Sequence, residues 1–395
     1  MTTNPTPAQV TDATMDWITT LMRVDTTSRE SNFALLDLVS AELREHGIEP
    51  VLIPNPEGTK ANLVATFPAA DGTTTGGIVL SGHTDVVPVD GQDWSSEPFS
   101  PQVRDGRLYG RGACDMKSFV GAVTARIPQL AAAPLLEPVH LAFSYDEEVG
   151  CTGAVDLVKD LVNRGLAPRA CIVGEPSSMR IINGHKSITL VRVDFHGVAA
   201  HSSLTPRGVN AIEYAASFVT FVRSVADDFR ANGPYDEAFD VPFTTCTVNL
   251  IEGGIAVNTV PADCSLQFEF RSIAAVDPTA LLERFRAELE TIEARMRAEN
   301  DAARVVMTVL AQAPGLDTPA DAEVARLAVA WGGEASTAKV AYGTEAGLFA
   351  DSGIPTVICG PGDIAQAHAP DEFVELDQIA RCEAFLDELI RSVRT

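Results

Sequence analysis

Amphipathic helical patterns alternate with short apolar runs along the first 186 residues of the chain. Apolar residues at helical spacing predict helices over residues 8–22, 32–47, 117–130 and 154–163. Asn32 is the predicted N-cap of the second helix and Gly47 its end. Apolar runs predict buried strands at residues 62–67, 78–81, 139–145 and 170–173. This alternation predicts a largely parallel sheet with helices on both faces.

The pattern changes near Ser187. It then predicts, in order, a strand at 188–195, a helix at 211–225, strands at 244–251 and 264–271, a helix at 278–299 and a strand at 304–310. The order β-α-β-β-α-β is typical of a ferredoxin-like α+β module. The α/β pattern returns after residue 314, with a helix at 322–330, a strand at 356–359 and a helix at 376–393. We therefore predict an α/β fold with a discontinuous domain, residues 1–186 and 314–395, and an inserted domain, residues 187–313.

Composition narrows the class of protein. A chain of 395 residues with 46% hydrophobic content can fill two cores. Its formal net charge of -25 opposes binding to nucleic acid, because neutralising phosphates requires clustered Lys and Arg. Residues 1–10 lack a basic start and an apolar stretch, and the sequence has no long uncharged apolar segment. We therefore expect neither secretion nor membrane insertion.

The cysteines indicate the redox environment. Seven cysteines are an odd number, and they are widely spaced without a Cys-x-x-Cys pair. This pattern favours neither a disulfide framework nor a thiolate zinc site. We therefore expect a cytoplasmic protein.

Acidic and imidazole side chains recur where the predicted strands of the α/β part end. The candidates are His83, Asp85, Asp115, Glu147, Glu148, Glu175 and His368. Each follows a strand-like run or lies in a Gly/Pro-rich stretch, and α/β proteins bind ligands outside the carboxyl ends of their strands. Carboxylate and imidazole donors without thiolates suit two divalent ions, zinc by default, with cobalt or manganese as substitutes. The sequence thus predicts a two-ion hydrolytic site.

Each candidate also has a structural interpretation. His83 can be a buried histidine at a strand end, and Asp115 can be the N-cap of the helix that follows it. The carboxylates of residues 146–148 can belong to a solvated loop, although beside a buried strand they repel one another unless cations compensate. Asp85, two residues after His83, is expected to hold the imidazole ring.

Five segments together resemble the M20 family of metallopeptidases and amidohydrolases. They are Ser81-Gly-His-Thr-Asp-Val-Val-Pro88, Gly110-Arg-Gly-Ala-Cys-Asp-Met-Lys117, Asp146-Glu-Glu148, Gly174-Glu-Pro-Ser177 and His368. The resemblance implies that Asp115 bridges two ions, that His83 and Glu175 complete one ligand set, and that Glu148 and His368 complete the other. It further implies catalytic roles for Glu147, as general base, and for Asp85. A cis peptide bond between Asp115 and Met116 is also implied.

The resemblance extends to the inserted domain and implies that it is a dimerisation domain, or lid. Gly197-Val-Ala-Ala-His201-Ser is similar to a family segment whose histidine reaches the active site of the partner subunit. A homodimer with His201 acting catalytically across the interface is therefore expected. From the residues alone, His201 can also be a surface or helix-capping residue.

The stretches 341–349 and 357–368 resemble the acetylornithine deacetylase branch of the family, as does Gly184-His-Lys186. The next residue, Ser187, departs from the usual Gly. The resemblance implies hydrolysis of the N-acetyl amide of N-acetyl-L-ornithine to L-ornithine and acetate, a step of arginine biosynthesis. One alternative is another M20 activity, namely an N-acyl-amino-acid hydrolase, a succinyl-diaminopimelate desuccinylase or a dipeptidase. Another is a catalytically inactive dimeric binding protein.

The same resemblance implies a set of substrate-binding residues. They are Asn258, Arg271, Gly343, Thr344 and Glu345. Asn258 and Arg271 match positions that hold the substrate carboxylate, a task for which the guanidinium fork is suited. Glu345 is expected to orient the amino groups of the substrate. A structural salt bridge is the alternative role for Arg271.

Overall fold

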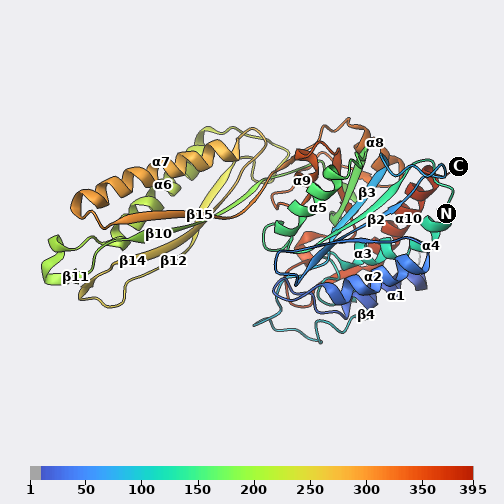
Figure 1. The fold of residues 1–395 in the computed structure, drawn as a ribbon, viewed down its shortest axis with the longest axis horizontal. Helices are drawn as coiled ribbons and strands as arrows, with labels where there is room; N and C mark the ends of the chain where they lie inside the picture. The colour runs from blue at the N-terminus through green and yellow to red at the C-terminus, as the bar shows by residue number, and fades with distance from the viewer. Residues whose placement is uncertain (1–9, 395) are drawn as a thin grey trace, which may run out of the picture. The chain divides into compact units, whose positions relative to one another are not determined.

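The structure is a computed structural model that describes residues 10–394. The start of the helix expected from residue 8, and nearly all of the N-terminal segment considered above, lie outside the described residues. The chain divides into two compact units (Figure 1). The first comprises the chain up to Gly184, Leu316–Ala338 and the segment from Thr344 onward, and the second comprises His185–Gly315 and Lys339–Gly343. The chain therefore passes between the units four times.

A six-stranded sheet with the order β1-β2-β6-β3-β7-β18 forms the centre of the first unit. Its strands are β1 (Val51–Pro54), β2 (Ala61–Phe67), β3 (Ile78–His83), β6 (Val139–Ser144), β7 (Ala170–Pro176) and β18 (Thr356–Gly360). Strands β6, β3, β7 and β18 run parallel, whereas β1 and β2 pair antiparallel at one edge. The predicted mostly parallel sheet is confirmed, and only β2, which is antiparallel to both β1 and β6, runs in the opposite direction.

Helices cover both faces of this sheet (Figure 1). They are α1 (Asp12–Met22), α2 (Phe33–Glu45), α3 (Lys117–Thr124), α4 (Ile127–Ala132), α5 (Thr152–Asn163), α8 (Glu323–Ala330), α9 (Ala346–Asp351) and α10 (Leu376–Ser392). Apolar side chains of α2, α3, α8 and α10 share one core with the sheet, and α5 and α9 lie together on the opposite face. The helix predicted over 117–130 is two helices, because Pro128 lacks an N–H and fits only a first turn.

Short ladders complete the first unit and its borders. They are β4 (Gln102–Arg104) and β5 (Arg107–Tyr109) with β19 (Phe373–Glu375), β8 (Arg180–Ile181) with β17 (Glu334–Ala335), and β9 (Gly184–His185) with β16 (Leu316–Asp317). Asn32 occupies the N-cap position of α2, but its side chain does not cap the helix. Its amide instead bonds to the backbone of Ala61 and to the Thr84 hydroxyl, which fixes the start of β2.

The second unit has the predicted β-α-β-β-α-β order. Its elements are β10 (Ile188–His196), α6 (Ala211–Asn232), β12 (Thr245–Gly253), β14 (Asp263–Arg271), α7 (Pro278–Glu299) and β15 (Arg304–Ala313), with β11 (Ala200–His201), η1 (Ser202–Arg207) and β13 (Thr259–Val260) beyond β10 and β12. The antiparallel sheet has the order β12-β14-β10-β15, and α6 and α7 bury its apolar residues, among them Phe218, Phe268 and Phe285. The ferredoxin-like module is confirmed.

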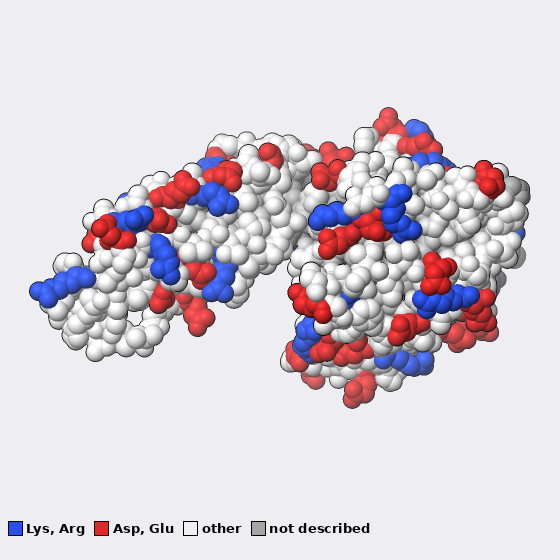
Figure 2. All heavy atoms as spheres, in the orientation of Figure 1, with Lys and Arg blue, Asp and Glu red and all other residues white. Residues whose placement is uncertain are grey.

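The surface carries charges of both signs. On the face shown in Figure 2, Lys and Arg side chains lie beside Asp and Glu side chains on each unit. Exposed pairs such as Arg223 with Asp227 and Arg164 with Asp160 add little to stability, because water screens them. Within residues 10–394, no helix has the length and apolar character needed to span a membrane.

Candidate metal centre

The candidate ligands lie where neighbouring strands of the central sheet end. Strand β3 ends at His83, which pairs with Ser144, the last residue of the parallel strand β6. The acidic residues 146–148 follow β6 after Tyr145, and Glu175 is next to last in β7, on the other side of β3. Because the carboxyl ends of parallel strands meet at one edge of a sheet, the backbone gathers side chains that are distant in sequence.

The first ligand group consists of His83, Asp115 and Glu175, all of them buried. Their donor atoms lie within 4.8 Å of one another. His83 Nε2 is 2.8 Å from Asp115 Oδ1 and 3.6 Å from Glu175 Oε1. Imidazole and carboxylate donors thus converge as they do around zinc.

The second ligand group consists of Asp115, Glu148 and His368, again with donor atoms within 4.8 Å. His368 Nε2 is 3.1 Å from Asp115 Oδ2 and 3.0 Å from Glu148 Oε2. Asp115 therefore presents Oδ1 to the first group and Oδ2 to the second. The peptide bond between Asp115 and Met116 is cis, which confirms that prediction.

The donor atoms fit a pair of cations. Glu148 Oε1 and Glu175 Oε1 are buried and have no hydrogen-bond partner among residues 10–394. Burying a carboxylate oxygen without a partner costs free energy, and native proteins pair such an oxygen or bind it to metal. One of these oxygens belongs to each ligand group, so each group keeps an acceptor that a divalent ion can use.

Crowded negative charge controls protonation at the centre. Burial and the neighbouring Asp115 carboxylate raise the pKa of Glu148 to about 7 and hold the pKa of Glu175 well above its ordinary value. Hydrogen bonds to Asp115 and Glu148 raise the pKa of His368 to about 10. Burial opposes ionisation of Asp115, but its bonds to His368 and His83 lower its pKa below the ordinary value. A cation among these carboxylates would favour their ionised forms, since opposite charge lowers a carboxyl pKa.

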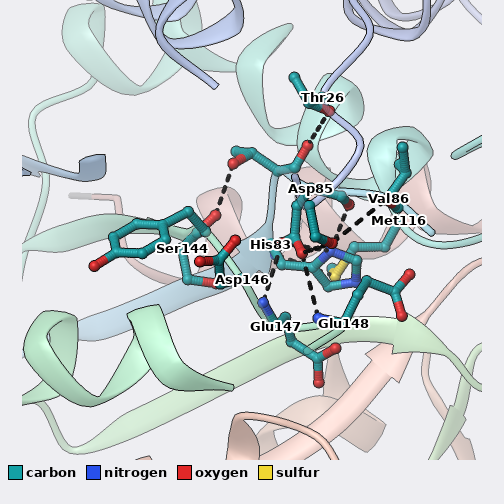
Figure 3. A network of polar contacts seen from close by, with 12 residues as sticks. Thr26, His83, Asp85, Val86, Met116, Ser144, Asp146, Glu147 and Glu148 are labelled. Carbon is teal, nitrogen blue, oxygen red and sulfur yellow. Dashed lines mark hydrogen bonds and ion pairs between the residues drawn. The ribbon is translucent and has the colours of Figure 1, made fainter. Parts of the chain in front are cut away.

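Asp85 holds both His83 and the segment after β6. Its backbone carbonyl lies 2.9 Å from His83 Nδ1, whereas its nearest carboxylate oxygen is 3.6 Å away. The carbonyl, rather than the carboxylate, therefore makes the hydrogen bond that orients the ring. The Asp85 carboxylate accepts the backbone N–H of Glu147 at 3.1 Å and of Glu148 at 3.3 Å (Figure 3). It also accepts the Ser28 hydroxyl at 2.7 Å.

The three adjacent carboxylates after β6 diverge (Figure 3). Asp146 pairs with Lys60, whose Nζ lies 2.6 Å from Asp146 Oδ1, while Glu148 enters the second ligand group. Lys60 thus supplies the cation that compensates the first of the three charges. Nothing in the local sequence marks Lys60 for this role, because it meets Asp146 only through the pairing of distant strands.

Glu147 belongs to neither ligand group. Its side chain is half-buried, and its Oε1 accepts the Cys151 thiol at 3.3 Å. Burial raises the pKa of Glu147 well above its ordinary value, and the neighbouring charge of Glu148 adds to the effect of burial. A carboxyl group with a raised pKa can take up a proton near neutral pH and give it back.

Four of the other candidates, His201, Asn258, Arg271 and Gly343, belong to the second unit. His201 is exposed and its Nδ1 lies 2.9 Å from the Ser203 hydroxyl. Arg271 pairs with Glu269 at 3.3 Å, in keeping with the structural alternative named for it. Asn258 is exposed, and its backbone carbonyl accepts the N–H of Ser202. Their roles toward substrate stay predictions.

Thr344 and Glu345 belong to the first unit. Glu345 is fully buried, and its carboxylate accepts the hydroxyls of Ser81 at 2.6 Å and Ser144 at 2.5 Å. The Thr344 hydroxyl accepts the N–H of Ala346 at the start of α9. These bonds tie α9 to the ends of β3 and β6, a link that the sequence did not indicate.

Comparison with known proteins extends this picture. The sequence pattern of Peptidase family M20/M25/M40 matches residues 79–392. A relative named acetylornithine deacetylase, from Myxococcus xanthus, is 36% identical over 374 residues, which cover 93% of this chain and 94% of the relative.

Solved structures share the fold. A metallo-carboxypeptidase of the M20 family from Sulfolobus solfataricus has a TM-score of 0.74 at 18% identity, covering 96% of this chain and 99% of that one. A dinuclear metal-binding peptidase of the same family from Bacillus subtilis has a TM-score of 0.66 at 14% identity, covering 96% and 97%. The chain belongs to Peptidase family M20/M25/M40 and is a metallo-hydrolase of that family.

Proposed function

We propose that the enzyme hydrolyses the N-acetyl amide of N-acetyl-L-ornithine to L-ornithine and acetate. The observation that carries this proposal is a pair of ligand groups sharing Asp115, with the separate carboxylate of Glu147 on the same loop as Glu148. Ligands for two ions, together with a carboxylate that is not a ligand and can act as a base, suit the attack of water on an amide. The Myxococcus xanthus relative supports the choice of acyl group and amino acid.

Two divalent ions would be held by the five side chains of the ligand groups. We propose zinc, with cobalt as a substitute, because every donor is imidazole or carboxylate. When bound, such ions polarise the scissile carbonyl and lower the pKa of a bound water toward about 7. The Bacillus subtilis relative, a dinuclear metal-binding peptidase, supports the number of ions.

Glu147 is the proposed general base. Its backbone N–H is fixed by the Asp85 carboxylate, so the loop that carries the base is anchored to the end of β3. Glu147 takes a proton from the attacking water and delivers it to the nitrogen of the leaving amine. Asp85 acts in this reaction by positioning Glu147 and, through its carbonyl, His83.

Recognition of the substrate is proposed for residues of both units. Asn258 and Arg271 would hold the carboxylate of the amino acid, to which a guanidinium can donate two parallel hydrogen bonds. Gly343 and Thr344 would contact the substrate next to this carboxylate. Glu345 would favour the ammonium of ornithine through its charge, because its oxygens are already bonded to Ser81 and Ser144.

We further propose that the enzyme is a homodimer in which His201 stabilises the developing oxyanion in the partner subunit. The second unit supports this with apolar side chains exposed to solvent near the end of β12. They are Leu250, Ile251, Ile255 and Val257, which are 60%, 53%, 90% and 102% exposed. Such a concentration of apolar surface is typical of an interaction site.

The proposed activity belongs to arginine biosynthesis, and we place it in the cytoplasm. The seven cysteines all lie within residues 10–394, and all are free thiols. Free buried thiols are typical of a reducing compartment, which supports this placement.

A substrate panel tests the proposal. N-acetylornithine, N-acetylmethionine, N-succinyl-diaminopimelate and a dipeptide are offered to the zinc-loaded enzyme and kcat/KM is measured for each. We expect N-acetylornithine to be cleaved with the highest kcat/KM. A higher value for another substrate would assign the enzyme to that M20 activity, and binding without turnover of any substrate would favour an inactive binding protein.

A further inference from the structure

A buried carboxylate joins two of the loops that carry ligands of the second group, those of Asp115 and His368. Glu372 lies four residues after His368 and is 1% exposed. Its Oε1 accepts the backbone N–H of Cys114 at 2.8 Å and of Asp115 at 3.1 Å. Its backbone carbonyl accepts the N–H of Gly110 at 2.9 Å. The His368 loop is therefore bonded to the Asp115 loop by both the side chain and the backbone of one residue.

Arg111 connects the same two loops through further hydrogen bonds. It is fully buried, and its Nη1 donates to Glu372 Oε2 at 2.5 Å. Its Nη2 donates to Gln92 Oε1 at 2.6 Å, and Gln92 Nε2 donates to the backbone carbonyl of His368 at 3.1 Å. The guanidinium also lies 5.0 Å from the centre of the Trp94 ring. A chain of bonds thus runs from the Asp115 amide through Glu372, Arg111 and Gln92 to His368.

The two ligand groups differ in what holds them. In the first group, His83 is the last residue of β3 and Glu175 lies within β7, so the central sheet fixes both. His368 lies outside helices and strands, has a φ of 61° and is half exposed. The hydrogen bonds through Glu372, Arg111 and Gln92 therefore fix the backbone of His368, as the sheet fixes that of His83.

We propose that Glu372 and Arg111 are positioning residues for the second ion site, and that their loss weakens ion binding there more than at the first site. Neither residue belongs to a ligand group. They act by fixing the backbone of Asp115 and His368. This inference rests on the proposed function of the centre as a two-ion site. Nothing in the sequence pattern singled out Glu372, because its partners lie more than 250 residues away.

Substitution of either residue has a defined physical effect. Glu372→Gln keeps the size of the side chain but leaves the Arg111 charge buried without its partner. Arg111→Lys keeps the charge but loses the planar fork that reaches Glu372 and Gln92 together. Residues that orient metal ligands typically contribute about 10–100-fold to metal affinity.

Zinc titration of the metal-stripped full-length protein, followed by calorimetry with a competing chelator, tests the proposal. We expect the wild type to bind two ions in two steps. Glu372→Gln and Arg111→Lys should weaken one step by about 10–100-fold and leave the other within about threefold. With cobalt as probe, the absorption bands of one ion should change and those of the other should persist.

Glu383→Gln is the matched control, because Glu383 is a buried carboxylate of the same unit that pairs with Arg126 instead. The Glu383→Gln protein should bind zinc in both steps with wild-type affinity. Gln92→Ala removes the bond to the His368 carbonyl without unpairing a buried charge, and it should weaken the same step by a smaller factor. This variant keeps the test decisive if the charge variants fold poorly, as judged by circular dichroism.

The outcomes separate the inference from the function on which it rests. Unchanged steps in the Glu372 and Gln92 variants, or an equal loss in both steps, would overturn the positioning role while leaving the two-ion centre intact. A wild-type protein that binds fewer than two ions would overturn the proposed centre itself, and with it this inference.

Discussion

Asp115 is the residue that makes the two ligand groups one centre. Each of its oxygens faces a different histidine, His83 on one side and His368 on the other. A substitution of Asp115 therefore removes a donor from both groups, whereas a substitution of either histidine removes a donor from one. Glu147 stands apart from both groups, so binding and chemistry can be separated by mutation.

Glu147→Gln tests this separation. We expect metal content equal to that of the wild type, because Glu147 is in neither ligand group. We expect kcat to fall by at least about 10²-fold, since glutamine cannot take up the proton of the attacking water. Metal analysis and steady-state kinetics on the same preparation measure both quantities. Near wild-type kcat would move the role of base to another residue.

Glu345→Gln tests the role of charge in substrate choice. The substitution preserves shape but removes the negative charge held by Ser81 and Ser144. We expect kcat/KM for N-acetylornithine to fall more than that for N-acetylmethionine, because only ornithine carries a side-chain ammonium. An equal fall for the two substrates would limit Glu345 to linking β3, β6 and α9.

Single residues differ in how far the sequence predicted them. The five ligand candidates could be predicted because strand ends collect polar residues and because their motifs are specific. The hydrogen-bond partners of single residues could not be predicted, as Asn32 and Asp85 show. Asn32 bonds to β2 instead of capping its helix, and the Asp85 carboxylate holds the backbone after β6. Local sequence carries the type of a side chain but not the distant group that it meets.

At the scale of elements, α1 and α10 are joined through one carboxylate. Glu383 of α10 accepts Thr11 N at 3.0 Å, the Thr11 and Thr14 hydroxyls at 2.5 Å each, and Arg126 Nη1 at 3.2 Å. Burial alone would raise the pKa of Glu383, but these bonds lower it below the ordinary value. The ionised form is thus stabilised by folding.

The stability of the first unit should therefore depend on this carboxylate and on pH. Because the folded pKa of Glu383 is the lower one, its contribution is complete above the unfolded value of about 4.3 and is lost as pH falls toward the folded value. Glu383→Gln should reduce the free energy of unfolding at pH 7 by about 1–3 kcal/mol. Between pH 5 and pH 3 the wild type should lose stability more steeply than the variant.

Urea unfolding followed by tryptophan fluorescence measures the free energy of unfolding of the wild type and the variant at each pH. All three tryptophans, Trp17, Trp94 and Trp331, belong to the first unit, so the signal reports the unit that contains Glu383. Parallel pH curves for wild type and variant would show that the bonds do not favour the ionised form.

Long periodic elements were predicted well, and short ones were not. The predicted bounds of α7 coincide with those observed, Pro278–Glu299, because a 22-residue amphipathic pattern begins with Asp277 and Pro278 as cap and first residue. Strands β4, β5 and β19 have three residues each, and β19 joins β5 from the far end of the chain. Their charged sequences show no apolar period, so only the folded chain brings them together.

At the scale of the whole molecule, dimerisation is proposed to be part of catalysis. His201→Ala and Glu147→Gln proteins should each be nearly inactive, since one lacks the oxyanion donor and the other the base. Unfolded together and refolded as a mixture, they form hybrid dimers in which one centre has both groups. We expect about a quarter of wild-type activity from random pairing. No recovery in a mixture shown to contain hybrids would contradict action across the interface.

The order of the ligands along the chain has a consequence for biosynthesis. His83, Asp115, Glu148 and Glu175 are translated well before the middle of the polypeptide, but His368 and Glu372 emerge near its end. A nascent chain can thus complete the first ligand group while the second still lacks its imidazole. A premature stop codon before residue 368 would leave a product able to capture a single ion at most, however well the remainder folds.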